Sequence, residues 1–226
     1  MKLTPHPATA AQPPFLLRAL ALFAVLCALV SLSACALPDK PARPSVYDFG
    51  VGAESAARPQ AALRAPVALA DVETSAALDS TAVLYRLGYA DVQQPRPYAN
   101  ARWSMAPALL LQQRLRERLG AQGAVLKPAQ AALLRGNEEA SPWVLRVELE
   151  EFSQLFSSPQ NSVGLLRLRA TVTQATPQGD KLLGQRNFAL QRPAPQADAA
   201  GGVRALTAAS DAAVDEVLQW LTTLRP

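Results

Sequence analysis

The sequence WVLRVELEEF, residues 143–152, alternates apolar and charged side chains and decides the fold of this chain. In an extended strand, Leu145, Val147 and Leu149 would point to one side, and the charged residues between them to the other. A second stretch, LLRLRATVT at residues 165–173, alternates in the same way. The two stretches predict neighbouring strands with one face in a core and the other in solvent.

A turn centred between Ser158 and Pro159 would join these strands in a register that satisfies both faces. The predicted pairs are Leu149 with Leu168, Leu145 with Val172, Glu148 with Arg169, and Glu150 with Arg167. Glu148 and Glu150 are also the nearest approach to a catalytic carboxylate pair. The opposing arginines favour cross-strand ion pairs instead, and this is our interpretation.

The remaining periodicity predicts an α+β domain, residues 46–226, in which two main helices pack in a second layer on an antiparallel or mixed β-sheet. Further strands are expected at 46–50, 67–72, 124–126 and 181–191, and residues 81–91 fit either two short strands or one bent strand. One long helix should begin near Ser104 and end by Gly120, a helical turn or two should cover 129–134, and a last helix should span 199–224 with Asp198 as its cap. Residues 94–103 fit neither pattern.

Both long helices show an apolar stripe and a charged face. In the first helix the charged face contains Arg114, Arg116 and Arg118, which we expect in solvent, although anionic lipid or a partner is an alternative contact. In the last helix Asp211 and Asp215 are expected to face out. Gly201 and Gly202, near its start, lack the lysine of a phosphate loop; they predict close contact between helix and sheet or, alternatively, a softer first turn of the helix.

The amino-terminal region has the pattern of a secretory signal peptide. Lys2 and Arg18 precede an apolar run that begins near Ala19 and ends in Leu32-Ser33-Ala34-Cys35. This ending resembles the lipobox of bacterial lipoproteins and implies cleavage after residue 34 and acylation of Cys35. Alternatives are an ordinary signal peptide with a chance cysteine, or an uncleaved anchor.

Residues 35–45 then form a tether with proline at every third position, which would span about 30 Å in polyproline geometry. Three acyl chains on one residue would make attachment effectively permanent. Ala36 is not the aspartate that retains well-studied Gram-negative lipoproteins in the inner membrane. By that resemblance, we expect the protein at the periplasmic face of the outer membrane.

Composition limits the chemistry that follows cleavage. His6 and Cys27 both precede Cys35, so the mature chain would have no histidine and no free thiol. Histidine-dependent catalysis, disulfides and most zinc sites are thereby excluded, and we predict no enzyme, no metal and no cofactor. Without Lys2 and Arg18 the chain keeps 20 basic against 18 acidic residues, so no nucleic-acid partner is indicated.

A cluster of aromatic and arginine side chains, residue types enriched at interface hot spots, predicts a partner-binding surface between residues 85 and 103. Its members are Tyr85, Arg86, Tyr89, Arg96, Tyr98, Asn100, Arg102 and Trp103. The alternative is that Tyr98 and Trp103 fold back onto the core of the domain, and both interpretations can hold for different residues.

The blocks LYRLGYAD at 84–91 and RPYANARW at 96–103 resemble the ABC-type transport auxiliary lipoproteins, the group that includes PqiC. The resemblance continues through 145–152, 191–195 and 201–206. It implies an outer-membrane lipoprotein that works with an ABC transporter and a periplasmic protein carrying MCE domains in lipid transport, and that forms a homo-oligomer. A lipid-anchored chaperone or assembly factor for outer-membrane components is the competing function, and a hydrolase is a third.

Overall fold

The computed structural model describes residues 43–51, 63, 65–133, 141–176 and 179–225, together with Phe15, Ala19, Leu20, Leu22 and Phe23. The chain divides into two units, Met1–Ala42 and Arg43–Pro226. The predicted lipobox, Cys35 and the tether up to residue 42 lie outside the described residues. Within the described part of the chain, no helix has the length and hydropathy needed to cross a membrane.

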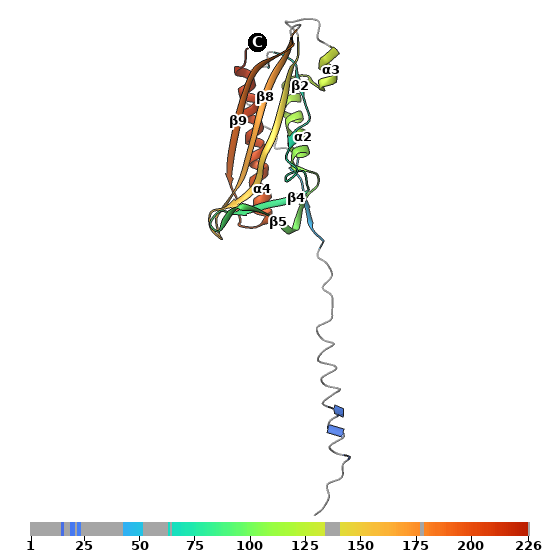
Figure 1. Cartoon of the computed structure of the whole chain (residues 1–226), viewed down its shortest axis with the longest axis vertical. Helices are drawn as coiled ribbons and strands as arrows, with labels where there is room; N and C mark the ends of the chain where they lie inside the picture. The colour runs from blue at the N-terminus through green and yellow to red at the C-terminus, as the bar shows by residue number, and fades with distance from the viewer. Residues whose placement is uncertain are drawn as a thin grey trace, which may run out of the picture. The chain divides into compact units, whose positions relative to one another are not determined.

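The centre of the domain is an antiparallel meander of three long strands (Figure 1). They are β7 (Trp143–Phe156), β8 (Ser162–Thr176) and β9 (Gly179–Pro193). β8 pairs along almost its whole length with β7 on one side and β9 on the other. The alternating stretches at 143–152 and 165–173 are therefore adjacent strands, as the sequence predicts.

Three short strands pair in parallel with β7, one after another, along the edge opposite β8. β2 (Val67–Leu69) pairs with its beginning, β3 (Glu73–Thr74) with its middle and β4 (Ala82–Leu87) with its end. β6 (Val125–Leu126) adds to β2, β5 (Asp91–Trp103) pairs antiparallel with β4, and β1 (Ser45–Tyr47) pairs parallel with the end of β5. The described strands thus form one open mixed sheet of nine strands.

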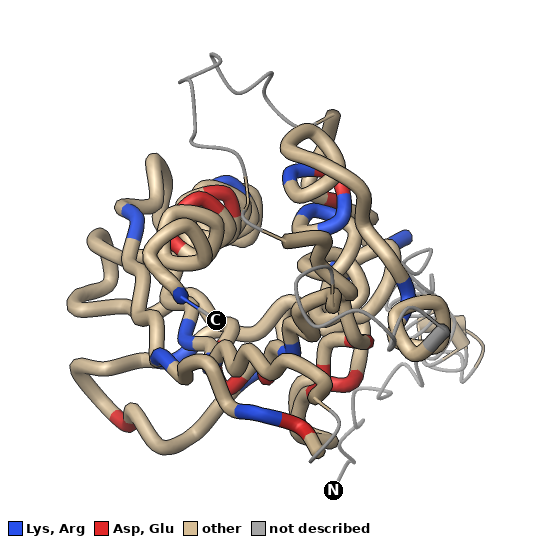
Figure 2. The backbone as a smooth tube through the Cα atoms, turned by 90° about the horizontal axis from the view of Figure 1, so that it is seen from above, with Lys and Arg blue, Asp and Glu red and all other residues tan. Residues whose placement is uncertain are grey.

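Two long helices, α2 (Pro107–Gly120) and α4 (Ala199–Thr223), lie side by side over one face of this sheet (Figures 1 and 2). A short helix, α3 (Pro128–Leu133), lies beside β2. The predicted α+β class with two main helices on a mixed sheet is confirmed. α4 begins as predicted, because the Asp198 side chain accepts a hydrogen bond from the Gly201 amide at 2.7 Å.

The first long helix begins two residues later than the sequence predicts. Ser104 does not cap it: the N-cap is Ala106, no side chain caps the helix, and Pro107 occupies its first turn. Proline there lacks only an amide that would have had no partner within the helix, so its fixed φ sets the starting point.

The predicted register is correct for half of the β7–β8 hairpin and shifts by one residue in the other half. Leu149 faces Leu168 as predicted, but Glu151, not Glu150, faces Arg167, because a β-bulge lies between Leu149 and Glu151. Glu150 is the extra residue. Beyond the bulge the inward set changes parity, which turns Phe152 and Phe156 into the core.

Residues 94–103, which fit no pattern in the sequence, are most of the 13-residue strand β5. Pro95 and Pro97 obscured the assignment, since proline is depleted in strands and confined to edges and irregular positions. Here the pairing of β5 with β4 is interrupted by register shifts, which accommodate the prolines. β5 is extended because its backbone pairs with β4 along most of its length and with β1 at its end.

Two glycines permit the contact between α4 and the sheet. A Cβ on Gly164 of β8 would lie 2.5 Å from the backbone carbonyl carbon of Ala205, and one on Gly202 would overlap the Gln154 side chain. The prediction of close helix-to-sheet contact at Gly202 is confirmed. Gly164 has the backbone of the helix as its nearest neighbour, which cannot move aside as a flexible side chain can.

We expect Gly164→Ala to lower the free energy of unfolding by about 1–3 kcal/mol through overpacking. Urea denaturation followed by circular dichroism would measure this change. Gly123→Ala is the matched control, because nothing lies within 4 Å of the added methyl group. Equal stabilities of the two variants would show that the α4–sheet distance is not set by Gly164.

Candidate functional site

The β4–β5 hairpin contains all the residues predicted to bind a partner, but they differ in exposure. Tyr89, at 49% exposure, Asn100 and Arg102 are exposed. Tyr85, Arg86, Arg96 and Tyr98 are partly buried. Trp103 is 2% exposed, so it cannot be a surface contact in this structure. The prediction for Trp103 is corrected: it is the residue that folds back onto the core.

Trp103 belongs to an aromatic cluster at the junction of three segments. Its ring centroid lies 5.7 Å from that of Phe49, edge to face, and 5.6 Å from that of Phe152. Such aromatic pairs add about 0.5–1.5 kcal/mol each beyond their buried area. The cluster fixes the end of β5 to β7 and to the loop after β1.

Two tyrosines of the hairpin, Tyr85 and Tyr98, form a second, partly polar cluster near the start of α4. Tyr85 and Tyr98 have ring centroids 4.6 Å apart, and the Tyr98 hydroxyl donates to Oε1 of Gln154 at 2.8 Å. Gln154 in turn donates to Ser162 Oγ at 2.7 Å. Burial, with smaller contributions from Tyr85 and Asp198, raises the pKa of Tyr98, so its hydroxyl stays protonated and remains a donor.

Arg86 holds the turn of the hairpin to β7. Its guanidinium binds both carboxylate oxygens of Glu151, at 3.3 and 3.0 Å, and donates to the backbone carbonyls of Val92 and Gln93. Glu151 is 7% exposed, and a paired arginine is the usual condition for burying a carboxylate. Arg86 is thus committed to the hairpin itself. Arg96 is bound more locally, to Gln94 of its own strand.

The two glutamates that resemble a catalytic pair share one arginine. Arg169 lies 3.3 Å from Glu148 and 2.5 Å from Glu150, measured between nitrogen and oxygen atoms. The interpretation as cross-strand ion pairs is confirmed for Glu148. For Glu150 the partner differs from the predicted Arg167, because the bulge places it beside Arg169 instead.

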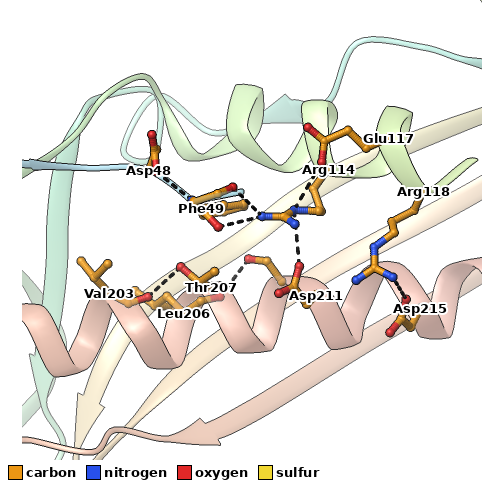
Figure 3. Close-up of polar contacts among 12 residues, drawn as sticks. Asp48, Phe49, Arg114, Glu117, Arg118, Val203, Leu206, Thr207, Asp211 and Asp215 are labelled. Atoms are coloured by element: carbon orange, nitrogen blue, oxygen red, sulfur yellow. Dashed lines mark hydrogen bonds and ion pairs between the residues drawn. The ribbon is translucent and has the colours of Figure 1, made fainter. Parts of the chain in front are cut away.

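A buried cation between the helices is a feature that the sequence analysis missed (Figure 3). Arg114 of α2, expected in solvent, is 2% exposed. Its Nη2 donates to the carbonyl of Phe49 at 2.8 Å and to that of Gly50 at 3.4 Å. Its Nε lies 3.4 Å from the carboxylate of Asp211 on α4 and 3.9 Å from that of Glu117.

The prediction that Asp211 and Asp215 face out is wrong for Asp211, which pairs with Arg114 of α2, whereas the Asp215 side chain is 46% exposed. Arg118 lies 3.6 Å from Asp215, one helical turn beyond the Arg114–Asp211 pair. Burial raises the pKa of Asp211, although the nearby Arg114 and Arg118 act in the opposite direction. The charged faces of the two helices are therefore partly turned toward each other.

A groove of about 460 Å³ opens between the segment 46–50 and α4. Val46, Tyr47 and Phe49 line one wall, and Val203 and Ala208 line the other. The polar groups along it are Asp48, Arg204, Thr207 and Asp211. Figure 3 shows the loop above the helix, with the Arg114–Asp211 pair at one end of the space between them. Its lining is mostly apolar.

The family model of the ABC-type transport auxiliary lipoprotein component matches residues 47–218. The chain belongs to this family. The match runs from Tyr47, the last residue of β1, into α4, and so includes the hairpin and every residue that lines the groove except Val46. A search of curated proteins gave no match.

Two solved structures have the same fold. Protein XCC0632 from Xanthomonas campestris is 16% identical, with a TM-score of 0.63 over 79% of this chain and 95% of that one. A second, described only as an uncharacterized protein, is 14% identical, with a TM-score of 0.55 over 79% of this chain and 99% of the other. At these identities the likeness establishes the fold alone.

Replacing Arg114 tests how much the buried cation contributes. We expect Arg114→Met to lower the free energy of unfolding by about 2–3 kcal/mol, because the Phe49 carbonyl and Asp211 would lose a charged donor. Hydrogen exchange at residues 47–50 should rise in the same variant. Arg116→Met, on the exposed side of the same helix, is the control and should leave both measurements unchanged.

Proposed function

We propose that this protein is a non-catalytic, outer-membrane lipoprotein component of an ABC/MCE-type intermembrane lipid transport system. In this role it docks a periplasmic MCE-domain protein at the outer membrane and works as a homo-oligomer. The family match over residues 47–218 carries the proposal, since it identifies an auxiliary lipoprotein component of ABC-type transport. The lipobox-like sequence before Cys35 supports the anchor, and Ala36 supports the outer membrane.

The β4–β5 hairpin supplies the proposed docking surface. Tyr89, Asn100 and Arg102 are exposed on a backbone that the core holds from behind through Tyr98 and Trp103. A rigid, pre-ordered surface loses little conformational entropy on binding. Aromatic and arginine side chains on such a surface are typical anchors of protein interfaces.

The triple variant Tyr89→Ala, Asn100→Ala, Arg102→Ala tests docking. The three side chains that it removes are exposed and make none of the core contacts described above. The variant should therefore keep the stability of the wild type. Co-purification with the MCE-domain protein should weaken at least about tenfold, the loss that corresponds to about 1.4 kcal/mol. The control is Gln113→Ala with Arg116→Ala, which alters an exposed face of α2. Undiminished co-purification by the triple variant would place the docking surface elsewhere.

Lipidation is tested at Cys35. The mature protein should begin at this residue and carry a diacylglycerol thioether and an acylated amino group in intact-mass analysis. Cys35→Ser should release the protein from washed outer membranes, because the anchoring acyl chains are lost. An unmodified cysteine still joined to residues 1–34 would overturn the anchor and, with it, the proposed location.

A further inference from the structure

We propose that the free edge of β9 binds an extended peptide segment of another protein. The segment adds to the sheet as a further strand and places an asparagine or glutamine side chain between β9 and α4. This site is separate from the β4–β5 hairpin and goes beyond the proposed docking role.

The backbone of β9 is paired along only one of its two edges. β9 is the outermost strand of the meander (Figure 1), and it pairs with β8 without interruption from Gly184 to Pro193. In an antiparallel strand, alternate residues direct their amides and carbonyls to opposite edges, so about half of these groups have no strand partner within the described part of the chain. Such a row of groups recognises one kind of occupant, another extended backbone.

The usual protection of a sheet edge is confined to the ends of β9. Proteins protect such edges with prolines, charges and bulges. Here the register with β8 shifts at Leu183, and Arg192 and Pro193 end the strand. Between these ends Arg186 is the only charged residue. The free edge of β5, by contrast, contains two prolines, so β9 is the better template.

A pocket of about 320 Å³ lies beside this edge, between β9 and α4. It is lined by Arg186 of β9 and by Glu216, Gln219, Trp220 and Thr223 of α4. Arg186 is on the helical face of the strand, since its guanidinium lies 4.9 Å from the ring centroid of Phe188, which packs against Trp220. Side chains alternate between the two faces of a strand, so every second side chain of an added strand would point toward this pocket.

The two charged groups of the pocket are unpaired. Within the described part of the chain, neither the Arg186 guanidinium nor the Glu216 carboxylate makes a hydrogen bond or an ion pair. An added strand would shield both groups from water, which is costly unless each finds a partner. A guanidinium only donates and a carboxylate only accepts, whereas a carboxamide does both. Asparagine or glutamine therefore matches the pocket, and an acidic or basic side chain would be repelled by one of the two groups.

A second copy of β9 does not offer this side chain. In the regular part of the strand the amide side chains are Gln185, Asn187 and Gln191, which alternate with Arg186 and so point away from α4. The first two bond to side chains of β8 on that other face. Antiparallel pairing of two β9 strands at the pocket would also bring two Arg186 side chains together. We therefore expect a segment of a different protein.

The test uses the full-length protein in nanodiscs and a seven-residue probe, TVTQTVT, with a fluorophore at its amino end. Fluorescence anisotropy should show saturable binding. Hydrogen exchange should slow in residues 184–191 when the probe is added, and should stay unchanged at 91–100, the free edge of β5. Replacing the central glutamine of the probe with glutamate, lysine or leucine should weaken binding at least about tenfold.

Two N-methylated probes test strand addition itself. One carries N-methyl groups on its odd-numbered residues and the other on its even-numbered residues, so only one of them loses the amides that face β9. One form should bind and the other should not. Equal binding of the two forms would mean contact without a shared ladder of hydrogen bonds and overturn the proposal.

Variants of the protein test the pocket. Arg186→Met, Glu216→Met should bind the glutamine and leucine probes equally, because both polar partners of the carboxamide are lost. Gln113→Ala, on the exposed face of α2, is the control and should keep the preference for glutamine. A preference that survives in the double variant would overturn the assignment of the pocket.

The remaining outcomes also decide the proposal. No saturable binding, or slower exchange only outside residues 184–191, overturns it. Slow exchange at 184–191 that depends on protein concentration without any probe would assign the edge to a second copy and overturn it as well.

The same measurements separate this inference from the proposed function. The hairpin variant Tyr89→Ala, Asn100→Ala, Arg102→Ala should bind the probe as the wild type does, because none of these residues lies on β9 or α4. Intact co-purification with the MCE-domain protein but no probe binding overturns the β9 site alone. Probe binding by a protein that never binds an MCE partner overturns the docking role while the β9 site stands.

Discussion

The β-bulge at Glu150 is the constraint on which the rest of the structure depends. Before it, odd-numbered residues of β7 face the helices, and after it even-numbered residues do. The shift turns Phe152 toward Phe49 and Trp103, and it turns Gln154 toward Tyr98. It also leaves Glu151 on the side where Arg86 can bind it. The Trp103 cluster and the Tyr85–Tyr98 cluster, which together fix the hairpin, therefore both depend on the one extra residue that β7 has relative to β8.

The Arg114 network has a comparable role on the helical side. A cation taken out of water needs several acceptors, and Arg114 draws them from the loop at 49–50, its own helix and α4. Its removal would leave acceptors in all three segments without their charged partner. The first of these segments follows β1. The buried charge thus ties the loop after β1 to both helices.

Much of the fold could be predicted from alternation and helix periodicity, because the strands at 143–152 and 165–173 and the α4 stripe each bury one clear face. The bulge left a trace in the sequence: Leu149 and Phe152 are three residues apart where alternation requires two. The burial of Arg114 left no such trace in the sequence, because a charged residue on a helix gives no sign that a second helix and a loop will cover it. The same holds for Asp211, whose partner is 97 positions away in the chain.

The candidate docking surface and the groove are joined by one pair of strands. β1 pairs with the end of β5, and in this register Val46 lies opposite Arg102. Val46 lines the groove, whereas Arg102 is exposed on the hairpin. Two neighbouring residues on paired strands cannot move independently, since a shift of one changes the hydrogen bonds of the other. A displacement of β1 would therefore act on β5, the strand that we propose contacts the partner.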